Sequence, residues 1–277
     1  MTGALTADRP DTRPYLCRER RETVLRLVLD RPERRNPLSE AMMAALQEAL
    51  DAAVEDRDAR VVVIAANGPA FSAGHDLREL TARRRDPDRG RAYFAEIMAR
   101  CSRLMQTVVK LPKPVIAEVQ GVASAAGCQL VASCDLAVAS SAAHFGTPGV
   151  NIGLFCSTPM VALSRNVAPK HAMEMLLTGE TISAEQARAY GLVNRVVPPE
   201  RLRDETEALA RLIASKPRAT VKIGKEAFYA QREMDLAAAY AYASDVMVEN
   251  MLHRDSEEGI GAFLDKRAPD WSRDPDR

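Results

Sequence analysis

The chain has 277 residues, 47% of them hydrophobic, and its 38 Lys and Arg side chains balance 38 Asp and Glu side chains. This hydrophobic fraction is sufficient for a buried core, and a chain without surplus positive charge is a poor candidate for a nucleic-acid partner. No apolar run approaches the roughly 18 residues of a membrane span, so no membrane partner is expected either.

The cysteines and the N-terminus indicate the compartment. The 5 cysteines have no Cys-x-x-Cys spacing, and an odd number does not suit a disulfide framework. We therefore expect a reducing environment. Residues 1–15 are rich in Asp, Arg, Pro and Thr and are interpreted as a flexible leader without the apolar core of a secretory signal. Together these features predict a cytoplasmic protein.

Strands and helices alternate through the first half of the chain. Residues 23–30 are short and apolar and predict a strand, and Pro37 with Ser39 opens a helix whose apolar residues recur at spacings of three and four. Residues 60–66 form a near-continuous apolar run, which is typical of a strand covered on both faces. A loop is expected over residues 67–76.

The middle of the chain continues the alternation. Residues 78–91 are dense in Arg and Asp and poor in apolar side chains, and they are predicted to be mobile. The elements expected next are a helix over residues 92–111, a strand over 115–120, a small-residue loop over 121–127, a helix over 128–134 and a strand over 136–140.

No strand is expected after about residue 198. The predicted helices of the second half cover residues 184–190, 200–215, 219–230, 235–250 and 256–266. The pattern therefore predicts an α/β core over residues 16–198, followed by a helical section over residues 199–277.

Two segments have the composition of ligand-binding loops. The first is Phe71-Ser-Ala-Gly-His75-Asp-Leu77, and the second is Gly121-Val-Ala-Ser-Ala-Ala-Gly127. Small side chains let a ligand approach the backbone, and a helix that begins near Gly127 presents free N–H groups and the positive end of its dipole. A tight helix-packing contact would also explain the second segment. Paired N–H donors of this kind can stabilise a developing oxyanion.

Both segments resemble the two halves of the oxyanion hole in the crotonase superfamily, the enoyl-CoA hydratases and isomerases. The resemblance extends from Thr23 to Trp271. It implies the crotonase (ClpP-like) α/β fold, a spiral of β-β-α units closed by a C-terminal helical section that builds a homotrimer or a dimer of trimers. It also implies that the N–H groups of His75 and Ala126 bind the carbonyl of an acyl-CoA thioester as it becomes an enolate.

The chain departs from the family pattern at both acid–base positions. Hydratases of the family carry one Glu directly after Gly-Cys and another in a Pro-Glu pair, whereas Gln129 and Gly149 occupy those positions here. A neutral amide does not titrate near pH 7, and glycine has no side chain, so hydration by two carboxylates is not expected. Isomerisation, decarboxylation or hydrolysis of a CoA thioester stay open, as does non-catalytic binding or sensing of acyl-CoA.

Other side chains near these positions are candidates for the missing chemistry. Cys156, with Ser157, falls where the family lines its acyl pocket, and it is interpreted either as a nucleophile or as a small apolar filler. Gln129 and Asn151 have amides that can orient a water. The His75 side chain can act in catalysis, as in superfamily decarboxylases with a similar Ser-Ala-Gly-His-Asp sequence, or it can point to solvent or to the CoA phosphates.

The resemblance also supplies a CoA site. Residues 31–38 resemble the turn at which the family backbone meets the CoA arm, and residues 258–267 resemble the terminal helix, where Phe263 would pack on adenine and Lys266 would meet a phosphate. A helix with Phe263 in the core would explain the same residues. The substrate-binding residues implied by the resemblance are Arg35, Pro37, Leu38, Ala73, Asp76, Leu77, Arg78, Ala125, Pro148, Cys156, Ser157, Phe263 and Lys266.

The sequence contains neither a metal-ligand spacing nor a glycine-rich phosphate loop. The 4 histidines fall on separate predicted elements. We expect no metal and no permanently bound cofactor, and coenzyme A enters only as part of the substrate.

Overall fold

A six-stranded sheet forms the centre of the molecule. The computed structural model describes residues 13–271. The strands of this sheet, in spatial order, are β1 (Leu16–Arg21), β2 (Val24–Leu29), β3 (Val61–Ala66), β5 (Val115–Val119), β7 (Leu136–Ser140) and β10 (Arg195–Val197). β1 and β2 are antiparallel, and every other neighbouring pair is parallel.

A second sheet of four short strands lies beside the first. Its strands, in order, are β4 (Ala70–Ser72), β6 (Val122–Ser124), β8 (His144–Gly146) and β9 (Thr181–Ser183). The chain gives β3 to the large sheet and β4 to the small one, and it repeats this with β5 and β6 and with β7 and β8. At least one helix follows each pair, so the expected spiral of β-β-α units is confirmed.

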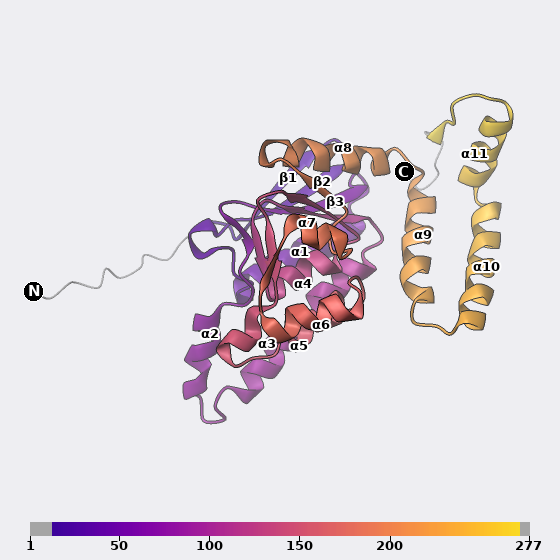
Figure 1. Ribbon diagram of the computed structural model, residues 1–277. Helices are drawn as coiled ribbons and strands as arrows, with labels where there is room; N and C mark the ends of the chain where they lie inside the picture. Colours follow the sequence, from indigo (N-terminus) through magenta and orange to yellow (C-terminus); the bar gives the residue numbers. More distant parts are fainter. Residues whose placement is uncertain (1–12, 272–277) are drawn as a thin grey trace, which may run out of the picture.

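Helices surround the sheets and continue beyond them (Figure 1). The α-helices are α1 (Glu40–Glu55), α2 (Leu77–Ala82), α3 (Arg91–Lys110), α4 (Ala126–Ser133), α5 (Ser157–Leu163), α6 (Pro169–Thr178), α7 (Ala184–Ala189), α8 (Leu202–Ala214), α9 (Arg218–Gln231), α10 (Leu236–Leu252) and α11 (Arg254–Leu264). Short 3-10 turns are η1 (Pro32–Arg34), η2 (Arg83–Arg85), η3 (Pro148–Ile152) and η4 (Pro199–Arg201).

Strand β3 is buried on both faces, as its continuous apolar run predicts. Val62 and Ile64 belong to the main apolar cluster, which includes the buried side of α1. Val61 and Val63 belong to a smaller cluster that includes Leu209 of α8. Because successive side chains of a strand point to opposite faces, α1 and α8 cover the two sides of the sheet.

Helix α1 follows the apolar spacing that predicted it. Ser39 is its N-cap, and the Ser39 hydroxyl accepts a hydrogen bond from the Met42 N–H at 3.2 Å. Met42, Leu46 and Leu50 are fully buried on the side facing the sheet. This helix begins next to the first candidate binding turn and therefore fixes the position of that turn.

Several short elements differ from the prediction. The loops expected over residues 67–76 and 121–127 contain β4 and β6, and residues 78–91, predicted to be mobile, contain α2 and η2. Strands of three residues are too short to show an alternating pattern, and pairing with their neighbours defines them instead. Helices α5 and α6 were not predicted. The predicted leader, residues 1–15, lies outside the described residues apart from its last three positions.

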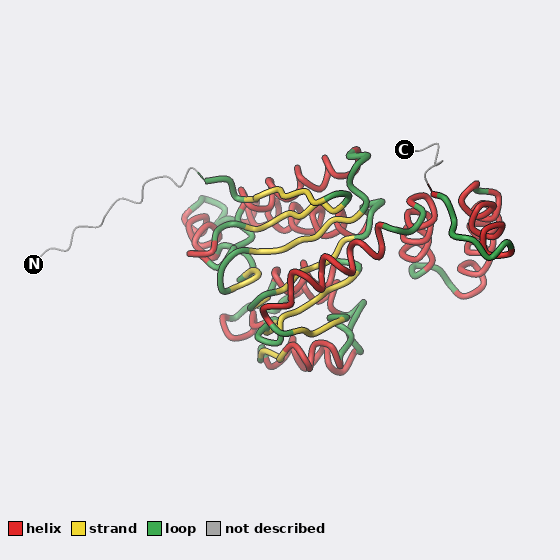
Figure 2. Tube along the Cα trace, turned by 90° about the horizontal axis from the view of Figure 1, so that it is seen from above, coloured by secondary structure: helices red, strands yellow, loops and turns green. Residues whose placement is uncertain are grey.

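The C-terminal helices were predicted correctly, and no strand follows β10 within residues 13–271. Figures 1 and 2 show α9, α10 and α11 as a group of helices beside the sheet-containing part of the molecule. None of the residues of α10 is buried. Large apolar side chains are exposed on α10 and α11, including Leu236, Tyr240, Leu252, Phe263 and Leu264.

Candidate functional site

Three segments that are separate in the chain meet beside the small sheet. The Leu38 N–H donates to the Gly74 carbonyl at 2.8 Å, and the Ala73 N–H donates to the Arg35 carbonyl at 2.9 Å. Gly74 has a φ of +89°, and a Cβ built on it would lie 3.2 Å from the Ala126 nitrogen. The loop before α2 therefore directly contacts the start of α4. Glycine is required at position 74, because only glycine adopts this backbone without strain and leaves room for so close an approach.

The first N–H groups of α4 have no acceptor, and that of Ala126 lies at this contact. Ala126 is the first residue of the helix, and the first N–H groups of a helix have no intrahelical acceptor. The Ala125 N–H, in contrast, donates to the Gly146 carbonyl at 2.9 Å. Within residues 13–271 neither the His75 N–H nor the Ala126 N–H donates to an acceptor. Two N–H groups without acceptors therefore occur on neighbouring segments, one on the loop before α2 and the other at the start of α4.

Backbone strain occurs at the same place. Ala125 has a φ of +49° and a ψ of −115°, a conformation that is rare for residues other than glycine. Gly127 packs against Ser72, because a Cβ on Gly127 would lie 2.4 Å from the Ser72 carbonyl oxygen. Strained backbone is concentrated at binding and active sites, where surrounding contacts keep it in place.

The His75 side chain is enclosed. Both ring nitrogens are buried without a hydrogen bond of normal geometry, and the Leu38 backbone carbonyl is close enough to act on the ring. Burial lowers the pKa of His75 below its ordinary value, so the ring is neutral at pH 7. The alternative in which this side chain points to solvent is therefore wrong. The same residue therefore carries a neutral imidazole and the first of the two N–H groups.

Asp76 and its neighbours build the start of α2. The Asp76 carboxylate accepts hydrogen bonds from the Arg78 N–H at 2.9 Å and the Glu79 N–H at 3.4 Å, and it lies 3.8 Å from the Arg34 guanidinium. Asp76 is therefore an N-cap. Leu77 is half exposed beside it. These residues shape the loop that contains the His75 N–H.

A buried asparagine, Asn36, fixes the turn of residues 35–38. The Asn36 amide donates to the Asn67 and Ala70 carbonyls, both at 2.8 Å, and accepts from the Arg31 N–H at 2.7 Å. Pro37 and Leu38 are buried, whereas Arg35 is exposed and pairs with no carboxylate of residues 13–271. Asn36 belongs to the sequence motif of this turn, but only these contacts show that its side chain holds the turn in position.

The two positions of the missing glutamates are both buried. Gln129 is buried in α4, and its side-chain oxygen is 3.9 Å from the Cys101 sulfur. Gly149 lies in η3, where a Cβ would be 2.5 Å from the Leu154 carbonyl oxygen and 2.8 Å from the Cys156 sulfur. Gly149 therefore has no room for a side chain.

Residues 148–157 contain no His, Asp, Glu or Lys. Pro148 begins η3, and Cys156 is the buried N-cap of α5. Burial raises the pKa of Cys156, which keeps its thiol protonated and supports the role of an apolar filler. Ser157 is exposed and donates to the Phe155 carbonyl at 3.3 Å. The Asn151 amide donates to the Gly179 carbonyl at 3.4 Å.

The predicted adenine and phosphate contacts do not join this region in one chain. Phe263 is 82% exposed, so its interpretation as a core residue is wrong. Phe263 and Lys266 lie at the end of α11, which packs against α10 on the far side of α9 (Figure 1). The structure thus joins the segments of Arg35, Gly74 and Ala126, and it leaves the two C-terminal residues apart from them.

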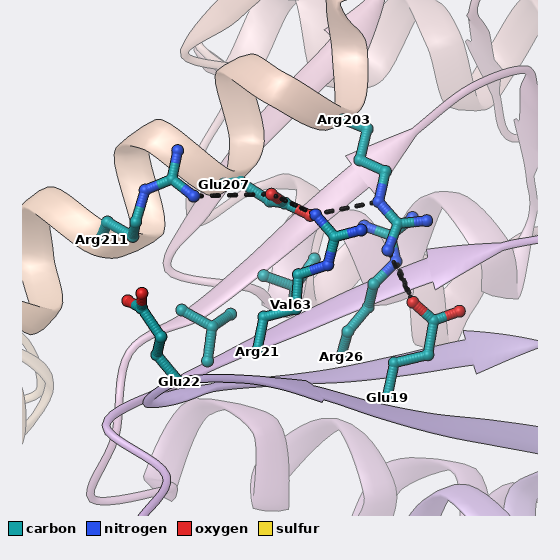
Figure 3. Close-up of a pocket in the computed structure, with 9 residues that line it drawn as sticks. Glu19, Arg21, Glu22, Arg26, Val63, Arg203, Glu207 and Arg211 are labelled. Carbon is teal, nitrogen blue, oxygen red and sulfur yellow. Dashed lines mark hydrogen bonds and ion pairs between the residues drawn. The ribbon is translucent and has the colours of Figure 1, made fainter.

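Two cavities differ in their relation to the site. The larger one, of about 740 Å³, is lined by Gln129 and by residues of α3, α5 and α9. The sequence did not predict this cavity, because it did not predict α5. The smaller one, of about 430 Å³, lies between β1, β2 and α8 and contains none of the predicted site residues (Figure 3).

The arginines and glutamates of the smaller cavity pair with one another. Glu207 lies 3.0 Å from Arg21, 3.1 Å from Arg203 and 3.6 Å from Arg211 (Figure 3). Arg203 also contacts Glu19 at 2.7 Å. These pairs satisfy the charges internally, so the smaller cavity is not a candidate binding site for CoA phosphates.

Among residues 13–271, no group of three or more His, Cys, Asp and Glu side chains is arranged to bind a metal ion. No helix in this part of the chain is long and apolar enough to cross a membrane.

Comparisons with known proteins agree with the resemblance. The model of the enoyl-CoA hydratase/isomerase family matches residues 19–274. The human protein named enoyl-CoA hydratase domain-containing protein 3, mitochondrial, is 50% identical over 265 residues, which cover 96% of this chain and 86% of that protein. The resemblance found in the sequence is confirmed.

Solved structures agree as well. The crystal structure of an enoyl-CoA hydratase from Mycobacterium smegmatis has 53% identity and a TM-score of 0.89, and the match covers 94% of this chain and 99% of that one. The human domain-containing protein 3 structure has 50% identity and a TM-score of 0.88, covering 94% and 100% of the two chains. The crotonase fold is confirmed.

One prediction is contradicted. The human, rat and mouse relatives are all named as mitochondrial proteins. The mitochondrial names of these relatives contradict the prediction of a cytoplasmic protein, which is therefore wrong. Composition and cysteine number distinguish oxidising from reducing environments, and they carry no information on which reducing compartment a protein occupies.

Proposed function

Since the chain belongs to the enoyl-CoA hydratase/isomerase family, we propose that it binds acyl-CoA thioesters and stabilises their enolates with the N–H groups of His75 and Ala126. The observation that carries this proposal is the pair of N–H groups without acceptors on two segments in direct contact. A carbonyl oxygen between them would receive two hydrogen bonds. Donors of this kind are typically worth about 3–4 kcal/mol each in the transition state.

The environment of the two donors favours this role. Ala126 is almost fully buried at the positive end of the α4 dipole, and His75 is neutral because its ring is enclosed. Fixed dipoles act more strongly on developing negative charge when water is excluded. We assign the oxyanion hole to these N–H groups, with Ala73, Gly74 and Ala125 positioning them.

CoA would enter as part of the substrate, without any permanently bound cofactor. Arg35 is exposed at the turn of residues 35–38 and has no carboxylate partner, so it is available for a phosphate of the CoA arm. Phe263 and Lys266 can contribute only from a second copy of the chain, because α11 lies far from the donors of its own chain.

Self-association is supported by the helices that would provide those residues. Leu236, Leu252, Phe263 and Leu264 are between 71% and 82% exposed on α10 and α11. An apolar surface of this extent is typical of a protein–protein interface. We propose a trimer or a dimer of trimers built by residues 199–277, around cores of residues 16–198.

The reaction is one that does not require two carboxylates. Gln129 cannot exchange a proton near pH 7, and Gly149 has no room for a side chain. We therefore propose isomerisation, decarboxylation or hydrolysis of a CoA thioester rather than simple hydration. The same observations favour one alternative function, non-catalytic binding or sensing of acyl-CoA.

Calorimetric titration with acyl-CoA thioesters and with free CoA tests the proposal. Acyl-CoA should bind more tightly than free CoA, because only the thioester has a carbonyl for the two N–H groups. A protein that binds no acyl-CoA would contradict the proposed function. Product analysis after incubation with each bound thioester then separates an enzyme from a binding protein.

A further inference from the structure

The segment that follows the His75 loop carries a group of exposed arginines, and we call residues 78–91 the arginine ridge. The arginines lie in α2, in η2, in the turn after η2 and at the start of α3: Arg78, Arg83, Arg84, Arg85, Arg89 and Arg91. None of them pairs with a carboxylate of residues 13–271. In the smaller cavity, by contrast, Glu207 alone pairs with three arginines. The ridge therefore leaves its positive charge available to a partner.

The carboxylates of the ridge do not neutralise it. Asp88 accepts a hydrogen bond from the Gly90 N–H at 2.9 Å, and Glu79 accepts one from the Glu40 N–H at 3.0 Å. The third carboxylate, Asp86, is half-buried. None of the three forms an ion pair with an arginine of the ridge. The ridge therefore has surplus positive charge, although the chain as a whole has none.

Packing holds the ridge in a fixed position. The Arg83 guanidinium lies 4.8 Å from the centre of the Tyr93 ring, and the Arg84 guanidinium lies 5.7 Å from that of Phe94. The Tyr93 hydroxyl donates to the Glu40 carboxylate at 2.8 Å, and Glu40 begins α1, the helix next to the first candidate binding turn. A partner that binds a fixed surface loses less affinity to the ordering of side chains.

The ridge lies next to the loop of the first N–H donor. Arg78 comes three residues after His75, and α2 begins between them at Leu77. Figure 1 shows α2 and the adjoining end of α3 projecting from the edge of the molecule, away from α9, α10 and α11. A partner on the ridge would therefore stand beside the His75 loop, and the C-terminal helices of the same chain would not cover it.

The charges of the ridge suit carboxylates on a protein surface. Guanidinium groups bind carboxylates through paired hydrogen bonds. None of the large apolar side chains that are exposed lies within residues 78–91, so the ridge has none to insert into a bilayer. Asp86 and Asp88 would also oppose the uniform negative charge of a membrane or a nucleic acid, whereas a protein can place its carboxylates apart from them.

We propose that the arginine ridge docks an acidic carrier protein that holds the acyl group as a thioester on a pantetheine arm. The inference rests on the proposed function, because the thioester carbonyl binds at His75 and Ala126 whichever group carries the arm. CoA and such a carrier share the pantetheine thioester and differ in what is attached to it. The ridge has more guanidinium groups than the CoA nucleotide has phosphates, which favours the larger, acidic protein as the occupant.

Calorimetric titration of the unmodified protein tests the inference with two probes, butyryl-CoA and an acidic acyl carrier protein charged with a butyryl thioester. The charged carrier should bind, and its affinity should fall as the salt concentration is raised, because the contact is between exposed charges. Binding of butyryl-CoA without binding of the carrier would overturn the inference and leave the proposed function standing. If neither thioester binds, the proposed function fails with it.

Substitutions in the ridge locate the docking surface. A triple variant with Arg85→Gln, Arg89→Gln and Arg91→Gln removes three charges, and these side chains make no ion pair or ring contact within residues 13–271. The fold should therefore be unchanged. The variant should bind the charged carrier about tenfold more weakly, whereas its affinity for butyryl-CoA should equal that of the unmodified protein.

The matched control removes the same charge elsewhere. Arg57→Gln, Arg103→Gln and Arg195→Gln replace exposed arginines of other surface segments that also lack carboxylate partners within residues 13–271, and this variant should bind the carrier normally. Equal losses in the two triple variants would reflect net charge alone and contradict the inference. A ridge variant that loses butyryl-CoA and the carrier equally would assign the ridge to CoA phosphates and overturn it. Binding to phosphatidylglycerol vesicles but not to the carrier would overturn it as well.

Discussion

The Cβ that Gly74 lacks would lie 3.2 Å from the backbone nitrogen of Ala126. This close approach joins the loop of the first N–H donor to the helix of the second one, and the positive φ of Gly74 makes it possible. The oxyanion hole that we propose therefore depends on a residue without a side chain.

Gly74→Ala should disrupt acyl-CoA binding. The substitution introduces strain of about 1–3 kcal/mol at positive φ and pushes the two loops apart. Gly153 is the matched control, because it also has a positive φ, of +77°, but nothing lies within 4 Å of its Cβ position. Urea unfolding should show the cost of positive φ in both variants and a larger loss for Gly74→Ala, whose Cβ also meets atoms at 3.0–3.2 Å. In titrations, only Gly74→Ala should lose affinity for acyl-CoA, and equal affinities would contradict the role of this contact.

Gly149 should not accept the glutamate of ordinary hydratases. Its φ is not positive, so backbone conformation is no obstacle, but a Cβ would lie 2.5 Å from the Leu154 oxygen. Gly149→Glu should cost about 1–3 kcal/mol of stability, and with Gln129→Glu it should not produce an efficient hydratase. Chemical unfolding and crotonyl-CoA hydration assays check this. A stable double variant with fast hydration would show that the loop of η3 adjusts freely.

Hydration of crotonyl-CoA by the unmodified protein should be slow. General acid–base catalysis commonly contributes about 10²–10⁴-fold, and Gln129 and Gly149 supply none of it. Steady-state kinetics on crotonyl-CoA measure this directly, with a two-glutamate hydratase assayed in parallel as the reference. A rate equal to that of the reference would require another acid–base pair in the site, for which His75 is the first candidate.

The free energy of unfolding should decrease when the pH falls below 6.5, the ordinary pKa of histidine. Burial lowers the pKa of His75, so the unfolded chain binds the proton more readily than the folded one. The contribution of His75 is present above pH 6.5 and is lost as the pH falls toward the folded pKa. Urea titrations at several pH values should show a smaller decrease for His75→Gln. Identical profiles for the two proteins would contradict this interpretation.

Lys225→Met should destabilise the attachment of α9. It leaves the Asp135 charge without its cation in a buried position, since the side chains of Lys225 and Asp135 are 7% and 15% exposed. Breaking a buried pair typically costs about 3–5 kcal/mol. The control is Arg201→Met, which removes an exposed pair with Glu205 and should cost less than about 1 kcal/mol. Similar unfolding free energies for both variants would exclude an anchoring role for Lys225.

The elements that sequence reasoning recovered are those with a long or distinct pattern. Ser39 and the spacing of Met42, Leu46 and Leu50 predicted α1, and the unbroken apolar run of β3 predicted a strand covered on both faces. Strands β4, β6 and β8 have three residues each and depend on partners far away in the chain. No local pattern can identify such strands.

The site, like the fold, was predictable where a local sequence pattern identifies it. The loops of His75 and Ala126 were identified from motif residues, since small residues and a helix start can be read from the sequence. The close approach of Gly74, the bonds of Asn36 and the lack of space at Gly149 depend on tertiary contacts. The position of exposed Phe263 far from the donors could not be predicted from a sequence motif either, because it depends on how α11 packs.

Isotope-edited infrared spectroscopy of a bound acyl-CoA labelled at the thioester carbonyl tests the central claim most directly. Two hydrogen bonds from the His75 and Ala126 N–H groups should shift the carbonyl stretch to lower frequency than in water. Ala126→Pro removes one donor and should reverse part of the shift, whereas His75→Gln keeps its N–H and should preserve most of it. A carbonyl stretch that is the same in the complex as in water would contradict the account.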